Sequence, residues 1–461
     1  MEQENERWQG NRAGTLMPGT LSTKLNRVAE TAKQKSYVFR TLAHLITEEA
    51  LAWSFRELRK DAAAGVDEVS AREYEQNLSV NLKDLHRRLR ERRYRAQPLR
   101  RVYIEKEDGK QRPLSIPVLE DKIVQKAVSA ILERIYERNF LPCSYGYRPR
   151  RSAHEAVEAI RWQVCGGKVS YVLEADIRDY FGSVVRSELK SMLQKRIQDK
   201  DVLRLIDKWL EVGVVEDGQL LLSEDGTYQG SVISPLLANV YLHEVLDLWV
   251  EEQVKPRMKG EMTLHRFADD FVACFQYQSD AKRFQQVLPK RFAKFGLKLH
   301  PEKTRLLAFG RSAEREAQRN AKSKPETFGF LGFTFYCGKS RAGKFLVKYK
   351  TMTKRLKRGL LRWGQWCRKN RHLPLQEQRE RLRVVLHGHY QYYGLPTNYQ
   401  SLERFYRGAK HLWRKWLGRR DRATPMTWQK FNRILQQYPL PAPRLRREVR
   451  CHQLALYGEF A

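Results

Sequence analysis

The sequence is poor in the features that mark membrane and secreted proteins. No apolar run approaches the roughly 20 residues that a membrane-spanning helix requires. Residues 1–9 are acidic and polar, so a secretory signal peptide is not expected. Only 6 of the 461 residues are cysteine, and no two of them form a C-x-x-C pair. A disulfide framework and a cysteine-rich zinc module are therefore disfavoured, and reduced thiols in the cytoplasm are expected.

Negative charge is scarce as well. The chain contains 53 Asp and Glu against 87 Lys and Arg, which leaves a net charge of +34. Residues 341–461 hold 29 of the basic side chains but only 6 of the acidic ones, a net charge of +23. A positive field of this size favours partners with phosphate backbones. The alternative, a basic surface that only meets solvent, is the weaker interpretation.

The pattern of apolar residues predicts an α+β body. Residues 101–117 alternate around Asp108-Gly109, which is typical of a β-hairpin. Helices are expected between the strands, so the order is not a regular βαβ array. The further predicted strands are 169–175, 264–268, 271–275, 305–309 and 328–336.

Changes in composition divide the chain into four segments. Residues 1–34 are polar and indicate a loose arm, and residues 35–340 contain the α+β body. Strand signals fade after about residue 343, so 341–428 is expected to be helical, basic and aromatic. Residues 429–461 indicate a short basic tail.

Two predicted strand ends carry candidate catalytic carboxylates. Asp269 and Asp270 lie between two apolar strands, and Asp176 follows the strand 169–175. Burial of such charges costs on the order of several kcal/mol each, so a metal or a basic partner is expected. Two Mg²⁺ ions about 4 Å apart require carboxylates from separate strands. Taken singly, an ordinary Asp-Asp turn and a strand-end cap remain equally good explanations.

A third motif lies between these strands. Gln229-Gly230 precedes Ser234-Pro235, which favours the start of a helix. A turn with glycine lets the backbone approach a base pair or a nucleotide closely. A plain junction between a loop and a helix is the alternative.

Taken in order, these motifs resemble those of reverse transcriptases, and among them the proteins encoded by bacterial group II introns. The resemblance covers about residues 60–335. It implies a right-hand polymerase, in which fingers and a palm with a mixed or antiparallel sheet precede an all-α basic thumb. The matching blocks are 65–67, 106–117, 144–149, the strand end at Asp176, 229–239, Asp269-Asp270, 296–304 and 328–333.

The resemblance also implies a role for each residue that matches a family motif. Asp176, Asp269 and Asp270 match the catalytic carboxylates, which would hold two Mg²⁺ ions together with the backbone carbonyl of Ile177. Phe181 matches the aromatic side chain that excludes a ribose 2′-hydroxyl. The residues that match nucleotide-binding positions are Lys106, Arg112, Phe181, Gln229, Gly230 and Lys303. One departure is Phe267, which stands where the family often has tyrosine.

Residues 383–416 interleave cations with aromatic side chains. This pattern suits phosphate contact and base stacking, although the aromatics could equally form the core of a helical bundle. The segment resembles the maturase-specific region of group II intron proteins over about 350–425, with His389 in place of a signature tryptophan. RNA contacts are expected at Arg414, Lys415, Arg419 and Arg420. The tail lacks the paired cysteines of the endonuclease module that some relatives carry.

The function that the resemblance implies is RNA-directed DNA synthesis for intron mobility, combined with assistance to intron splicing. The expected partners are a structured intron RNA, a DNA primer or target and dNTPs. The protein is expected in the cytoplasm, associated with the nucleoid or with a ribonucleoprotein, and no membrane partner is expected. A homodimer is possible. Two alternatives remain. One is a domesticated enzyme of DNA repair or phage defence, and the other is an RNA-binding splicing factor whose polymerase is unused.

Overall fold

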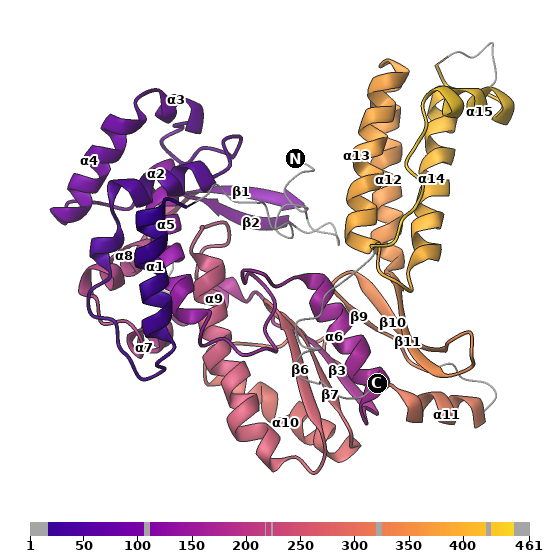
Figure 1. Cartoon of the computed structure of the whole chain (residues 1–461), viewed down its shortest axis with the longest axis horizontal. Helices are drawn as coiled ribbons and strands as arrows, with labels where there is room; N and C mark the ends of the chain where they lie inside the picture. Colours follow the sequence, from indigo (N-terminus) through magenta and orange to yellow (C-terminus); the bar gives the residue numbers. More distant parts are fainter. Residues whose placement is uncertain are drawn as a thin grey trace.

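The computed structural model describes residues 17–105, 111–216, 218–222, 225–319, 325–420 and 426–446. Three parts are evident in Figure 1: a helical layer, a central sheet with its covering helices, and a helical bundle on the far side of that sheet. No helix in the described ranges is long and apolar enough to cross a membrane.

The helical layer packs around α5, which is buried along most of its length. The hairpin of β1 and β2 borders the layer and points toward the side on which the bundle stands (Figure 1). β4 pairs with β1 in parallel, so this sheet has the order β2-β1-β4-β5. The elements are α1 (Gly19–Ala32), α2 (Glu48–Glu57), α3 (Ala71–Gln76), α4 (Leu78–Arg90), β1 (Leu99–Glu105), β2 (Gln111–Ile116), α5 (Leu119–Tyr136), α7 (Arg186–Gln194), α8 (Lys200–Glu211), β4 (Val214–Glu216) and β5 (Gln219–Leu221).

The prediction of a loose arm over residues 1–34 is wrong for residues 19–32. These residues form α1, which packs against α5. Leu21, Leu25 and Ala29 are buried there, at the four-residue spacing of one helix face. The polar residues between them conceal this spacing when composition alone is considered.

The central sheet is antiparallel throughout, in the order β6-β7-β3-β8. Leu173 and Ala273 pack on the side of α9 and α10, whereas Val172 and Val272 pack on the side of α6. The inner strands are therefore buried on both faces, which explains their continuous apolar runs. The elements are α6 (Ala153–Gly166), β3 (Tyr171–Asp176), α9 (Ser234–Leu242), β6 (Met262–Phe267), β7 (Asp270–Phe275), α10 (Gln278–Ala293), β8 (Arg305–Ala308) and α11 (Arg311–Arg319).

A three-stranded sheet links the central sheet to the bundle. The predicted strand 328–336 is in fact two strands, β9 (Phe328–Phe330) and β10 (Phe333–Lys339). They are joined at Leu331 and Gly332, whose φ angles of 48° and 80° make a tight hairpin turn.

The helical prediction after residue 340 is wrong for 345–351. These residues form β11 (Phe345–Thr351), which pairs with β10 along its whole length. Val347, Tyr349 and Thr351 are buried at a spacing of two, and the lysines between them masked this alternation. The boundary expected at 340 therefore falls inside a hairpin, and the helical region begins only at Thr353.

The bundle consists of α12 (Thr353–Lys369), α13 (Leu375–Tyr393) and α14 (Tyr399–Leu417), capped by α15 (Trp428–Gln437). Trp413 lies at its centre without solvent exposure, so part of the aromatic content is bundle core. Residues 438–446, which belong to the predicted basic tail, return along α13. The Arg446 amide donates to the Gly394 carbonyl at 2.7 Å. Residues 447–461 lie outside the described ranges.

Candidate active site

The three aspartates meet at one end of the central sheet. Asp176 is the last residue of β3, and it pairs directly with Asp270, the first residue of β7. Phe267 pairs with Asp270 and closes the β6–β7 hairpin, so Ala268 and Asp269 form a two-residue turn. The predicted arrangement of carboxylates from separate strands is therefore present.

These carboxylates repel one another in a partly buried site. Burial, and then the neighbouring charge of Asp176, raises the pKa of Asp269 to about 6. The same two causes raise the pKa of Asp270 well above its ordinary value. Arg112 and Lys303 act in the opposite direction on Asp269. The site thus holds more negative charge than its own cations compensate.

Lys303 supplies the nearest positive charge. Its ammonium forms an ion pair with the Asp176 carboxylate, while its side chain remains largely exposed. Burial lowers the pKa of Lys303, but the hydrogen bond and charge of Asp176 outweigh this and leave the pKa raised. A second ion pair joins Arg305 of β8 to Glu174 at 2.7 Å, and Glu174 lies two residues before Asp176 on β3.

No three His, Cys, Asp or Glu side chains within the described ranges stand together as a ready metal site. The donor set nevertheless fits a divalent cation, since hard carboxylate oxygens suit Mg²⁺ and the cluster carries more negative charge than Lys303 and Arg112 offset. Ile177 lies beside them and faces the same cleft. Ile177 forms an antiparallel β-bridge with Leu299. The two hydrogen bonds of this bridge come from the neighbouring residues: the Arg178 amide donates to the Lys298 carbonyl, and the His300 amide donates to the Asp176 carbonyl.

The matched nucleotide-binding residues fall into three groups. The first group lines the same cleft as the aspartates and consists of Arg112, Phe181, Gln229 and Lys303. Gly230 has another role: its φ is +112°, and a Cβ there would lie 2.7 Å from the Ser115 carbonyl oxygen of β2. Only glycine permits this close approach. Lys106 lies outside the described residues.

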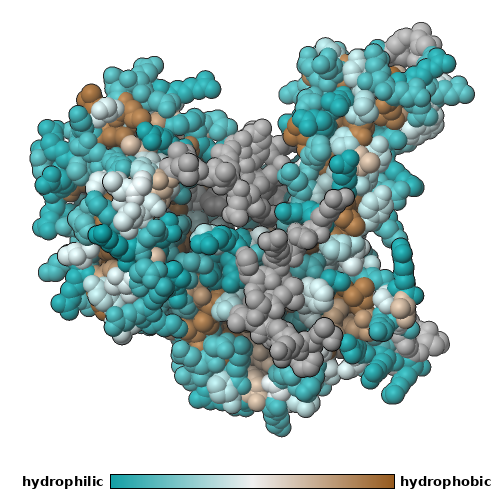
Figure 2. All heavy atoms as spheres, in the orientation of Figure 1, coloured by the Kyte–Doolittle hydropathy of each residue, from teal (hydrophilic) through white to brown (hydrophobic). Residues whose placement is uncertain are grey.

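A cleft of about 1810 Å³ runs from the aspartates to the bundle. The molecule is hollowed between the helical layer and the bundle, where hydrophilic side chains predominate on both flanks (Figure 2). The basic residues that line the cleft are Arg112, Arg150, Arg151, Arg178, Lys303, Arg305, Arg355, Arg358, Arg362, Arg381 and Arg446.

Arg414, Lys415, Arg419 and Arg420 are not among the described residues that line this cleft. The Arg414 guanidinium donates to the Met426 carbonyl at 2.8 Å and lies 4.4 Å from the centre of the Trp428 ring. Arg420 donates to the carbonyls of Arg371 and Leu373 in the α12–α13 loop. Arg414 thus connects α14 to the segment before α15, and Arg420 connects the end of α14 to the α12–α13 loop. The sequence pattern did not reveal these contacts.

The basic face toward the cleft was missed by sequence reasoning. Arg355, Arg358 and Arg362 lie on α12, and Arg381 lies on α13. The three residues of α12 follow the spacing i, i+3, i+7, which places them on one helix face. This spacing was available in the sequence, but the many other arginines of the region obscured it.

The segment Gly388–Tyr393 also reaches the cleft. His389 stacks on Phe405 with 3.8 Å between ring centroids, and burial lowers the pKa of His389 to about 3. The Tyr392 hydroxyl donates to the Leu331 carbonyl at 2.8 Å. This signature therefore attaches the bundle to the β9–β10 turn beside Asp270.

Comparison with known proteins agrees with this geometry. The family model described as reverse transcriptase (RNA-dependent DNA polymerase) matches residues 104–335, half of the chain. Protein YkfC of Escherichia coli is 38% identical over 192 residues, which cover 41% of this chain and 50% of YkfC. Group II intron-encoded protein LtrA of Lactococcus lactis is 40% identical over 165 residues, 36% of this chain and 27% of LtrA.

A third relative is the nuclear intron maturase 2 of Arabidopsis thaliana, 28% identical over 176 residues, 30% of this chain and 24% of that protein. The aligned segments span half or less of each of these relatives. The resemblance to group II intron proteins that the motifs indicated is confirmed by these matches. With a family model over half its length and the three aspartates at one sheet end, the chain belongs to the reverse transcriptase family.

Proposed function

We propose that this protein is an RNA-directed DNA polymerase of the group II intron type, which binds intron RNA, assists its splicing and copies it into DNA. The observation that carries the proposal is the meeting of Asp176, Asp269 and Asp270 at the floor of a basic cleft. In this interpretation the helical layer corresponds to the fingers, the central sheet to the palm and the bundle to the thumb.

Asp176 and Asp269, with the Ile177 carbonyl, are the proposed ligands for two Mg²⁺ ions, and Asp270 acts more through its local charge. When bound, such ions would lower the pKa of an attacking 3′-hydroxyl and stabilise the leaving pyrophosphate. The Lys303 ammonium on Asp176 occupies the region where this positive charge is needed. In the loaded site we expect Lys303 to turn toward the leaving group.

The remaining cleft residues would handle the nucleotide. Arg112 is exposed on β2 and close enough to lower the pKa of Asp269, so it can meet a triphosphate placed over the aspartates. The partly buried ring of Phe181 faces the same space and would contact the sugar. Gln229 borders this position from the turn that packs on Ser115.

Cleft arginines on α12 and α13 would hold the template and the structured RNA. The relatives named as an intron-encoded protein and an intron maturase support intron RNA as this partner. A DNA primer or target and dNTPs complete the proposed set of substrates. The homodimer and the association with nucleoid or ribonucleoprotein stay predictions.

Primer extension tests the proposal. Purified protein with Mg²⁺, dNTPs and a DNA primer annealed to an RNA template is expected to produce DNA complementary to that RNA. Omission of Mg²⁺ should abolish the product, because the carboxylates then lack their proposed cation. A preparation that binds the primer–template but adds no nucleotide would contradict the proposal and would favour the splicing-factor alternative.

RNA binding is expected to depend on the face of the bundle that lines the cleft more than on its outer face, by which we mean the side that does not line the cleft. Replacing Arg355, Arg358 and Arg362 together with glutamine should weaken binding and flatten its dependence on salt by about two units of the log–log slope. The measurement is a filter-binding salt titration with structured RNA. The comparison variant carries Lys415→Gln and Arg419→Gln on the outer face. If this double variant weakens RNA binding as much as the triple variant on α12 does, the RNA contacts the outer face of the bundle.

A further inference from the structure

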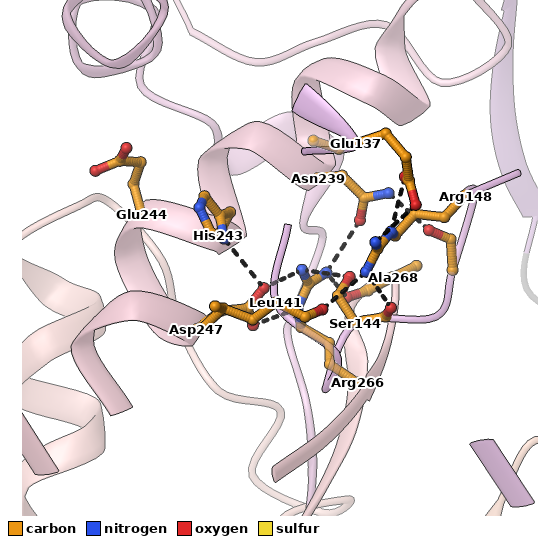
Figure 3. A network of polar contacts seen from close by, with 12 residues as sticks. Glu137, Leu141, Ser144, Arg148, Asn239, His243, Glu244, Asp247, Arg266 and Ala268 are labelled. Atoms are coloured by element: carbon orange, nitrogen blue, oxygen red, sulfur yellow. Dashed lines mark hydrogen bonds and ion pairs between the residues drawn. The ribbon is translucent and has the colours of Figure 1, made fainter. Parts of the chain in front are cut away.

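Arg266 is fully buried. It lies two residues before Ala268, the first residue of the hairpin turn that carries Asp269. Figure 3 shows its guanidinium enclosed by groups from several segments. Its Nε and Nη2 donate to the two carboxylate oxygens of Asp247 at 2.7 and 2.5 Å. Its other donors reach the Asn239 side-chain oxygen at 3.0 Å, the Ser144 hydroxyl at 2.8 Å and the Ala268 carbonyl at 3.1 Å. All five N–H groups of the guanidinium therefore have acceptors.

Such a buried ion pair is poorly explained by stability alone. Asp247 is as buried as Arg266, and the cost of removing both charges from water largely offsets their attraction. Apolar side chains of similar volume would fill the space at least as well. Apolar side chains cannot reproduce the hydrogen bonds of the guanidinium, and one of these reaches the Ala268 carbonyl, inside the turn that carries Asp269.

The turn has an unfavourable backbone conformation that needs such a hold. Ala268 has a φ of 57°, in the left-handed region that non-glycine residues rarely adopt. Strain of this kind persists where the surrounding structure fixes it, and it is common at functional sites. Here the fixing groups are Arg266 on one side and Gly146 on the other.

Gly146 packs directly on the turn. A Cβ at this position would lie 2.4 Å from the Ala268 nitrogen, so no other residue permits the approach. The Gly146 carbonyl accepts a hydrogen bond from the Asn239 amide at 2.6 Å, and Asn239 also accepts from Arg266. The segments 144–149, 234–239 and 266–270 thus converge on one backbone turn.

A change in helix geometry brings the acceptors of Arg266 together. α9 continues into π-helical turns at His243–Asp247 and Val250–Val254. On an α-helix, residues eight apart such as Asn239 and Asp247 would lie about 80° apart around the axis. The wider π turn contains one extra residue, so the angle between Asn239 and Asp247 around the helix axis falls to about 20°. Both side chains therefore reach the same guanidinium.

We propose that Arg266, held by Asp247 and Asn239, is a positioning residue that fixes the Ala268–Asp269 turn so that Asp269 faces Asp176. This inference rests on the proposed function of the same carboxylates. Arg266 touches neither substrate nor metal in this arrangement; it acts through the Ala268 carbonyl. A displaced turn would impair the chemical step while leaving the nucleic-acid surface of the bundle intact.

The test is single-turnover incorporation by Arg266→Lys, which keeps the charge but has too few donors for the full set of contacts. We expect the rate constant per active molecule to fall by about 10- to 100-fold, since a misplacement near 1 Å can cost that much. Affinity for primer–template, measured by fluorescence anisotropy without Mg²⁺, should stay within about twofold of the unmodified protein, because that surface is unchanged.

Two further variants separate positioning from general destabilisation. Gly146→Ala pushes the turn from the other side without removing a buried charge, so its rate constant should fall as well. Arg196→Lys changes another buried arginine, which donates to the Ala32 carbonyl at 3.0 Å far from the turn. It should lower the melting temperature without changing the rate constant.

Each outcome either supports or contradicts the positioning role of Arg266. If Arg266→Lys does not fold, Gly146→Ala carries the test alone. Unchanged rate constants in the folded turn variants would overturn the inference, as would an equal loss in Arg196→Lys. If the unmodified protein makes no DNA at all, it is the proposed function that fails, and not the positioning of the turn.

Discussion

Replacing Asp269 with asparagine is expected to reduce nucleotide incorporation on the order of 10³-fold or more. Asparagine keeps the size of the side chain, so the two-residue turn should persist, but the negative charge that would hold a cation is lost. Asp176→Asn should have an effect of similar size, because Asp176 faces the same site from β3. The measurement is single-turnover primer extension at saturating Mg²⁺ and dNTP.

Asp207→Asn is a matched control. Asp207 pairs with Lys190 at 2.6 Å on the surface of the helical layer, and its loss should leave extension unchanged. RNA affinity of the two active-site variants should also stay close to that of the unmodified protein, since the basic face lies on the bundle. Extension by either active-site variant at a normal rate would remove Asp176 and Asp269 from the proposed metal site.

The second large effect concerns the choice of sugar. Phe181→Val should increase the use of ribonucleotides relative to deoxyribonucleotides by about 10²-fold, because a smaller side chain relieves a clash with the 2′-hydroxyl. The Phe181 carbonyl accepts a hydrogen bond from the Thr227 amide at 2.7 Å. The backbone is thus fixed, and the substitution acts through the ring. The ratio of kcat/KM values for each nucleotide pair is the quantity to measure.

Tyr180→Phe provides the control for this experiment. Its hydroxyl donates to the Ala238 carbonyl inside the core, and its ring is buried. Loss of that hydroxyl should lower stability without changing sugar selectivity. If Phe181→Val remains active and equally selective, another residue contacts the 2′ position.

The three candidate carboxylates could be predicted because their strands are buried on both faces, and such strands appear in the sequence as apolar runs that end in aspartate. The order of the motifs predicted that Asp176, Asp269 and Asp270 share one site, and the structure brings them together at one end of the central sheet. Arg266 could not be assigned in this way. An arginine inside a strand is usually exposed, and its partner Asp247 lies 19 positions earlier in the sequence.

The basic region shows a different limit. Its net charge shows that cations are abundant there, but charge alone does not distinguish an arginine that faces the cleft from one that closes a loop. Arg420 binds loop carbonyls, whereas Arg358 faces the cleft, although both lie in equally basic surroundings. Only the packing of α12 against α14 decides which side of each helix is open.

The π-helical turn at His243–Asp247 has a consequence for how this protein tolerates change in length. A π turn can be regarded as an α-helix that has accommodated one inserted residue. A return to regular α-helix with no change in the number of residues would restore regular backbone hydrogen bonds there, and would rotate everything after it by about 100°. The helix could then gain intrinsic regularity only by withdrawing Asp247 from Arg266. Deleting one residue between Asn239 and Asp247 would instead keep these two side chains about 20° apart around the axis. This segment is therefore expected to tolerate the loss of one residue better than a return to regular α-helix at full length, provided that both acceptors of Arg266 are kept.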